Sequence, residues 1–88
     1  MIPPCAFIIR MSMPLAAMQG ILECALNRSI KVKSMNLQFL NDREGILILH
    51  CNLEKDRVKY TGALLEKIGG VIEVETLQAH VSNLTKLQ

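Results

Sequence analysis

The chain of 88 residues is half apolar and one-fifth charged, with a formal net charge of only +2. This length supports a single domain whose core is barely sufficient, so association with another chain is expected. The weak net charge does not favour nucleic acid as a partner. Because no apolar run reaches the roughly 20 residues that cross a bilayer, we expect a cytoplasmic protein.

The first element is predicted to be a strand over residues 5–12, because apolar and branched residues alternate there. Its two sides consist of Phe7, Ile9 and Met11 on one, and of Ile8, Arg10 and Ser12 on the other. The apolar run is interrupted by Arg10 and has no basic region ahead of it, which argues against a secretory signal.

A helix is predicted over residues 14–29, where a proline suits the first turn and apolar residues recur at helical spacing. The stripe expected to be buried consists of Leu15, Met18, Leu22 and Ala25. Gly20 lies inside this helix and costs about 1 kcal/mol relative to alanine. We interpret it as permitting a close approach of the sheet.

The second strand is predicted over residues 30–40, and its apolar alternation slips near Lys33 and Ser34. Ile30 and Val32 share one side, whereas Met35, Leu37 and Phe39 share the other. The second set is expected to be buried. Such a slip in a half-buried strand predicts a bulge or a twist.

Residues 41–45, "NDREG", have the composition of a hairpin turn. A third strand is predicted over residues 46–54, with two faces that alternate. Leu47, Leu49, Cys51 and Leu53 form one face, and Ile46, Ile48 and His50 form the other.

The second helix is predicted over residues 55–70 and ends in a double glycine. Its expected buried stripe consists of Val58, Thr61, Leu65 and Ile68. A fourth strand is predicted over residues 71–81, where outward glutamates alternate with Ile72 and Val74. Residues 82–88 are expected to form a C-terminal tail.

This order predicts an α+β, ferredoxin-like βαββαβ domain over residues 1–81, with a four-stranded antiparallel sheet and two helices on one face. The other face should then carry Ile46 and Ile48, together with some of Ile8, Ile30 and Val32. Together these side chains predict an apolar patch used for association, and a modestly apolar exposed surface is the alternative.

The chain lacks the residues that several proteins of this topology use for chemistry. The loop "SMPLAA" has neither the glycine and positive charge of an anion-binding loop nor the cysteines of a metallochaperone. Two phenylalanines and one tyrosine provide few platforms for RNA bases. His50 and Cys51 should point to opposite faces of their strand, and no catalytic set can be assembled, so a noncatalytic protein is predicted.

The three cysteines, Cys5, Cys24 and Cys51, are odd in number and form no C-x-x-C pair. In an intracellular protein this pattern indicates reduced thiols rather than a structural disulfide or a zinc site. No metal or cofactor is therefore expected on this chain.

Two segments, "RSIKVKSMN" at residues 28–36 and "LLEKIGGVIEV" at residues 64–74, carry a family resemblance. They resemble the small regulatory subunits of acetolactate (acetohydroxyacid) synthase, isozyme II type, which are built on the ACT domain. The residues that fit the family pattern are Arg28, Val32, Ser34, Met35 and Asn36 in the first segment, and Leu65, Lys67, Ile68, Val71 and Val74 in the second. Ser29 and the double glycine depart from that pattern.

The resemblance implies an ACT domain that joins a second copy side by side into one continuous sheet. It also implies binding to the large subunit of acetolactate synthase, in branched-chain amino-acid biosynthesis. Thiamine diphosphate, Mg²⁺ and FAD would belong to that catalytic partner. The candidate subunit interface consists of Ile30, Val32, Ser34, Asn36, Ile46 and Ile48.

The candidate effector loop consists of Met13, Pro14, Leu15 and Ala16. ACT domains that sense amino acids resemble one another in an "N/D-x-x-G" element here, and Met13 and Ala16 stand at its polar and glycine positions. The resemblance implies a branched-chain amino acid as a ligand of this loop. Because Met13 and Ala16 replace the polar residue and the glycine of the element, we expect weak sensitivity to valine. The alternative is that the loop only caps the core, with Met13, Leu15 and Met18 as packing residues.

Two other functions stay open on the sequence. The chain could be a free-standing ACT domain that binds an amino acid and regulates another enzyme or a transcription factor. It could also be a small structural dimer without a ligand.

Overall fold

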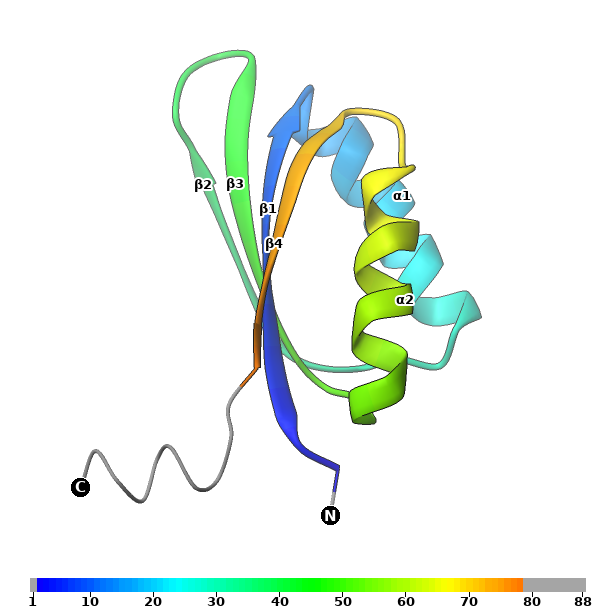
Figure 1. Cartoon of the computed structure of the whole chain (residues 1–88). Helices are drawn as coiled ribbons and strands as arrows, with labels where there is room; N and C mark the ends of the chain where they lie inside the picture. Colours follow the sequence, from blue (N-terminus) through cyan, green and yellow to red (C-terminus); the bar gives the residue numbers. More distant parts are fainter. Residues whose placement is uncertain (1, 79–88) are drawn as a thin grey trace, which may run out of the picture.

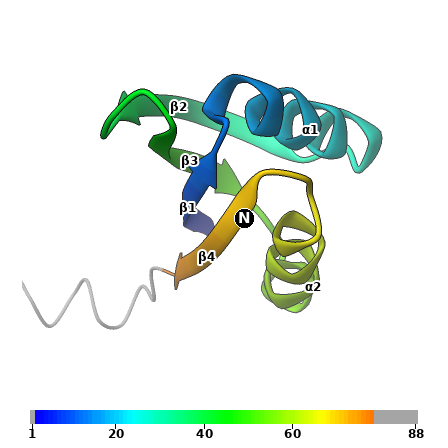
Figure 2. The ribbon, with the colours of Figure 1, turned by 90° about the horizontal axis from the view of Figure 1, so that it is seen from above.

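The structure, a computed structural model, describes residues 2–78 and contains one antiparallel sheet with the strand order β2-β3-β1-β4. Both helices cover the same face of this sheet (Figures 1 and 2). The elements are β1 (Pro4–Ser12), α1 (Pro14–Asn27), β2 (Lys31–Phe39), β3 (Glu44–Asn52), α2 (Lys55–Glu66) and β4 (Val71–Gln78). The predicted α+β, βαββαβ fold is confirmed. Residues 79–88, with His80 and the predicted tail, lie outside the described residues.

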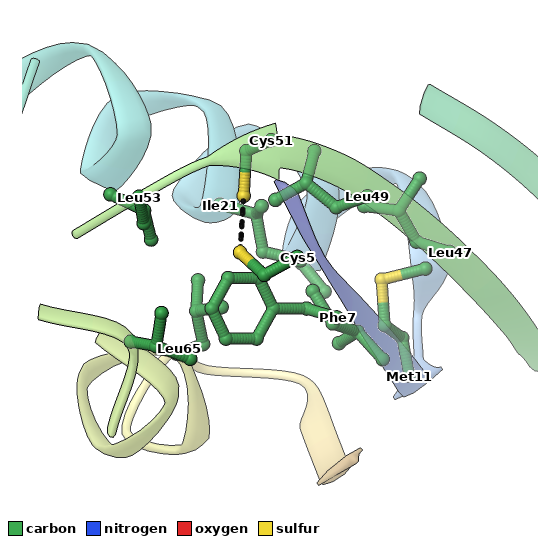
Figure 3. Packing of buried hydrophobic residues seen from close by; sticks show 12 residues of the cluster. Cys5, Phe7, Met11, Ile21, Leu47, Leu49, Cys51, Leu53 and Leu65 are labelled. Carbon is green, nitrogen blue, oxygen red and sulfur yellow. Dashed lines mark hydrogen bonds between the residues drawn. The ribbon is translucent and has the colours of Figure 1, made fainter. Parts of the chain in front are cut away.

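The two central strands, β1 and β3, bury one face against the helices as their alternation predicts. The buried side chains of this face are Cys5, Phe7, Ile9, Met11, Leu47, Leu49 and Cys51, and Leu53 is buried just beyond the end of β3. Each large apolar side chain in this layer contributes about 1.5–3 kcal/mol through its burial. Figure 3 shows how these side chains pack between the sheet and the helices.

Strand β2 contains the predicted bulge, because its register with β3 shifts between Val32 and Ser34. The extra residue changes which side chains share a face. Val32 pairs with Cys51, on the helix side, and Ile30 packs against the core. The prediction that these two residues face away from Met35 and Leu37 is therefore wrong.

Phe39 was expected to be buried, but its side chain is 54% exposed. It lies at the end of the edge strand β2, opposite Gly45 and beside only the first turn of α1. The prediction is wrong because no helix extends over this corner of the sheet far enough to cover the ring.

Helix α1 buries Ala25 as predicted, but the rest of its buried stripe differs from the predicted one. The observed stripe is Pro14, Ala17, Ile21 and Ala25, whereas Leu15 is 71% and Leu22 42% exposed. Both stripes have helical spacing, and close contacts select between them. A Cβ on Gly45 would lie 3.0 Å from Pro14, and one on Gly70 would lie 3.0 Å from Ala17. These close contacts place α1 on the side that carries Pro14, Ala17 and Ile21, and leave Leu15 and Leu22 on the exposed side.

Helix α2 buries Val58, Thr61 and Leu65, and Ile68 packs partly buried against the core, as predicted. The helix ends at Glu66, before the double glycine. A Cβ on Gly20 would lie only 2.6 Å from Cγ2 of Ile68. Gly20 therefore permits a close approach, but to the end of α2 rather than to the sheet.

Strand β4 does not keep the predicted alternation at its start. Its register with β1 shifts between Arg10 and Met11, and the extra residue leaves Ile72 53% exposed. Val71 and Val74 pack against the core instead. The grouping of Ile72 with Val74 is wrong because a bulge separates them.

The predicted hairpin turn between β2 and β3 is confirmed. Asn41 Oδ1 accepts hydrogen bonds from the backbone N–H groups of Arg43 and Glu44 at 2.8 and 2.9 Å. The turn is shorter than predicted, because β3 begins at Glu44.

Candidate functional site

The face of the sheet away from the helices, here called the open face, carries an apolar strip at its centre. Ile8 of β1 pairs with Ile48 of β3, and Ala6 pairs with Leu77 of the edge strand β4. Ile8, Ile46 and Ile48 are each partly exposed, and Leu77 is about half exposed. The strip is therefore an apolar surface to which water has access in the isolated chain.

Polar residues of β2 border this strip along one side. Ser34 pairs with His50, Asn36 with Ile48, and Gln38 with Ile46. The open face thus brings together four of the six residues of the candidate interface: Ser34, Asn36, Ile46 and Ile48. Ile30 and Val32 are not among them, because the bulge places them on the helix side.

An ion pair closes the strip at the end near the β2–β3 turn. Arg10 Nη2 donates to Glu44 Oε2 at 2.9 Å, and Arg10 Nε donates to the same oxygen at 3.2 Å. The hydrogen bond and the charge of Glu44 raise the pKa of the Arg10 guanidinium. The open face therefore has a charged rim beside an apolar centre, an arrangement that also occurs at protein interfaces.

The candidate effector loop forms the beginning of α1. Met13 precedes the helix with φ of 50° and ψ of 63°, and no side chain caps the first turn. Its backbone N–H donates to the carbonyl oxygen of Arg43 at 3.0 Å, so the loop is bound to the β2–β3 turn. The left-handed conformation suits asparagine, aspartate or glycine better than methionine.

A shallow hollow of about 210 Å³ lies against this loop. Its lining consists of Met13, Pro14, Leu15, Ala16, Phe39 and Asp42. The uncapped N-terminus of α1 favours negative charge there, and Phe39 supplies an apolar wall. The four predicted loop residues are thus brought together beside one small depression, in which Pro14 is buried and Met13 is exposed.

The two segments that carry the family resemblance lead into the two edge strands. Arg28 follows α1, lies over the ring of Tyr60 at 5.7 Å, and accepts a hydrogen bond on its carbonyl oxygen from Arg57 at 2.8 Å. Ser29 then adopts a positive φ of 54°, at the position where the family pattern has glycine. This tight turn brings the chain into β2.

A contact between two buried thiols was not foreseen from the sequence. Cys5 and Cys51 face each other across β1 and β3, with their sulfur atoms 3.4 Å apart (Figure 3). Burial raises the pKa of both thiols, to about 12 for Cys51. The alternation patterns place both residues on inward faces, but only the strand register makes them direct partners.

Within residues 2–78, no group of three or more histidine, cysteine or acidic side chains could hold a metal ion. His50 and Cys51 lie on opposite faces, as predicted, because they are neighbours on one strand. No helix of the described part of the chain is long and apolar enough to span a bilayer. The arrangement is suited to binding through the open face and the loop.

Comparison with solved structures identifies the type of fold. The ACT domain from GTP pyrophosphokinase of Chlorobium tepidum has a TM-score of 0.71 at 14% identity, and the match covers 88% of this chain and 100% of that chain. The C-terminal domain of the MgtC protein from Mycobacterium tuberculosis has a TM-score of 0.70 at 15% identity, with 91% and 90% covered.

A homoserine dehydrogenase from Thiobacillus denitrificans is also similar, with a TM-score of 0.67 at 20% identity over 91% of this chain and 18% of that longer chain. No family model and no curated protein sequence matches the chain. The structural matches show that the chain has an ACT-like fold.

Proposed function

We propose that this chain is a noncatalytic regulatory subunit that binds and activates the catalytic subunit of an acetolactate synthase. The observation that carries this proposal is the position of Ser34 and Asn36. Both belong to the segment that resembles the small subunits of that enzyme, and both lie on the open face beside Ile46 and Ile48. The resemblance and the uncovered apolar strip thus coincide on one surface.

The proposal gives each chain a separate task. Thiamine diphosphate, Mg²⁺ and FAD would be held by the large subunit, where acetolactate is formed. Two copies of the small chain would pair side by side through edge strands, which would also cover unpaired backbone groups. This arrangement leaves the open face available to the catalytic partner.

The loop before α1 supports activation more than feedback by valine. Met13 offers no polar side chain to an amino acid, and its backbone N–H is already used by Arg43. Ala16 carries a Cβ where the family element has glycine. A ligand's carboxylate would therefore find fewer donors in this hollow than in the loops that the chain resembles.

The direct test is acetolactate formation by the cognate large subunit, measured with and without this chain, each in the presence and absence of valine. We expect the chain to raise the rate and valine to leave the increase largely intact. If a range of chain concentrations does not change the rate, the proposal fails.

A pair of variants locates the surface used. Asn36→Lys places a long charged side chain on the open face, whereas Gln19→Lys places the same group on the exposed side of α1. Activation should require a several-fold higher concentration of the first variant and be unchanged for the second. Equal activation by both variants would exclude the open face as the contact surface.

A second function, a free-standing ACT domain that binds an amino acid, is favoured by one observation. The hollow of about 210 Å³ beside the uncapped end of α1 is large enough for a small amino acid. A rise in the melting temperature of the isolated chain with valine or leucine, and without any large subunit, would favour this function.

A further inference from the structure

Cys5 and Cys51 occupy directly opposed positions in the two central strands. Their residues are partners in the antiparallel register of β1 and β3, and their sulfur atoms lie 3.4 Å apart. Both side chains are buried, at 5% and 1% exposure. The thiols therefore meet without any rearrangement of the backbone.

The backbone geometry at this point suits a covalent bond between the two sulfurs. Leu53 N–H donates to the carbonyl oxygen of Pro3 at 3.2 Å, two residues beyond the cysteines. Hydrogen-bonded pairs recur every second residue, so Cys5 and Cys51 form a pair of the same kind, with Cα atoms about 5.5 Å apart. A disulfide requires about 4.4–6.8 Å between Cα atoms.

We propose that Cys5 and Cys51 are a redox modification site that forms a reversible cross-strand disulfide with a low-molecular-weight disulfide as oxidant. This inference goes beyond the regulatory function proposed above and does not depend on it. In a reducing compartment the pair is a dithiol, and an oxidising shift converts it. The third cysteine, Cys24, lies on α1 and takes no part.

The reaction proceeds by two thiol–disulfide exchanges. The Cys5 thiolate attacks one sulfur of oxidised glutathione, which forms a mixed disulfide and releases one glutathione. The Cys51 thiolate then attacks the Cys5 sulfur and releases the second glutathione. The protein loses two thiol protons and two electrons, and one glutathione disulfide is reduced to two thiols.

Cys5 is the thiol that reacts first with the oxidant, because the end of β1 that carries it has fewer backbone hydrogen bonds to hold it in the sheet. The hollow of about 260 Å³ beside this end of β1 lies among Ala6, His50 and Leu77 on the open face, so the thiol on the other face becomes accessible only when the strand end opens. Pro3 and Pro4 donate no N–H to the sheet, so this end of β1 has fewer backbone bonds to break. Local opening there exposes Cys5 before Cys51.

Burial makes the exchange slow at neutral pH. Desolvation raises the pKa of both thiols, so little thiolate is present until the end of β1 opens. The rate of oxidation should therefore increase with pH. Brief oxidant exposure would leave the pair reduced, whereas sustained exposure would oxidise it.

The test is oxidation of the folded, full chain with oxidised glutathione at low protein concentration, followed by trypsin digestion without reductant. Arg10, Arg28, Arg43 and Lys55 separate the three cysteines into different peptides, residues 1–10, 11–28 and 44–55. We expect a disulfide-linked pair of the first and third peptides, which dithiothreitol separates. The product should lack two hydrogen atoms relative to the reduced chain.

A change in thermal stability provides a second readout. The bond would join residues 46 positions apart in the sequence. Closing a loop of this length should raise the melting temperature of the oxidised chain by about 15 °C or more. An unchanged or lower melting temperature would overturn the claim that the bond forms within the native sheet.

Two variants complete the experiment. Cys24→Ala should form the same linked peptides and show the same rise in melting temperature. Cys51→Ala should give only a glutathione adduct or no product, and if this variant does not fold, the peptide map of the unmodified chain decides alone. Linkage through Cys24, covalent dimers, or a stable glutathione adduct on the unmodified chain would each overturn the proposal.

Discussion

Gly69 and Gly70 are neighbours after α2, but only one of them is constrained. Gly70 has a φ of 93°, and an added Cβ would lie 2.9 Å from the carbonyl oxygen of Ser12. Nothing lies within 4 Å of a Cβ on Gly69. We expect Gly70→Ala to lower the free energy of unfolding by about 2 kcal/mol, because the backbone and the contact are both strained.

The matched control is Gly69→Ala, which should change the free energy of unfolding by less than about 0.5 kcal/mol. Urea unfolding followed by circular dichroism measures both variants. Equal destabilisation by the two substitutions would show that Ser12 and Gly70 do not meet as described.

The buried thiols make stability depend on alkaline pH. Burial raises the pKa of Cys51 from 9.0 to about 12, and it raises that of Cys5 as well. The folded state thus holds these protons more tightly than the unfolded state does. Their contribution to stability is complete below pH 9.0 and is lost as the pH rises towards about 12.

We therefore expect the unmodified chain, kept reduced, to lose more stability between about pH 8 and about pH 10 than a Cys5→Ala, Cys51→Ala double variant. All other side chains are the same in the two proteins, so the comparison isolates the two thiols. Urea midpoints at the two pH values measure the effect. Parallel pH profiles for the two proteins would contradict it.

At the scale of elements, α1 meets the segment that follows α2 at Gly20 and Ile68. An alanine at position 20 gains about 1 kcal/mol in helix propensity but would bring its Cβ to 2.6 Å from Ile68 Cγ2. Overpacking of this kind costs about 1–3 kcal/mol. We expect Gly20→Ala to destabilise the unmodified chain and to stabilise an Ile68→Ala variant.

The measurement is a double-mutant cycle of unfolding free energies. A coupling energy of about 1–3 kcal/mol between the two positions is the expected result. If Gly20→Ala has the same effect in the unmodified chain and in the Ile68→Ala variant, residues 20 and 68 do not contact each other.

At the scale of the whole molecule, the open face carries an apolar strip that the helices leave uncovered. Ile48 lies at its centre, between Ile8 and Asn36 on the neighbouring strands. We expect Ile48→Asp to weaken association with the catalytic partner at least ten-fold, because burying the aspartate in that interface would remove its carboxylate from water. The fold should lose only about 1 kcal/mol, because the position is partly exposed.

Leu26→Asp is the control, since Leu26 is an exposed residue of α1 on the helix layer. Size-exclusion chromatography with the large subunit, over a range of concentrations, measures this association, and urea unfolding measures stability. Unchanged co-elution of Ile48→Asp with the large subunit, or an equal effect of both variants, would exclude the open face as the contact surface.

The sequence predicted the element order and the faces of β1 and β3 correctly. Strands with one buried face show it as a period of two, so Phe7, Ile9 and Leu49 could be assigned without coordinates. The slip at Lys33 also predicted the bulge in β2. The pattern did not show that the bulge turns Ile30 and Val32 to the helix side, because the face of each residue depends on its pairing with β3.

The rotation of α1 and the pairing of the two thiols depend on contacts between distant segments. Leu15 and Ala17 both lie on helical stripes, and only the contacts of Pro14 with Gly45 and of Ala17 with Gly70 decide which is buried. The six residues of the candidate interface are also separated by a contact between strands, the register of β2 with β3. Ser34, Asn36, Ile46 and Ile48 gather on one face, whereas Ile30 and Val32 are turned to the other by the bulge.

By itself, the sequence determined the fold class, the buried faces of the central strands and the stripe of α2, because local periodicity reports which residues avoid water. Only the tertiary structure decided the register, the bulge in β4, the rotation of α1 and the contact of Cys5 with Cys51. These features arise where two segments meet, and their geometry depends on the shapes of both.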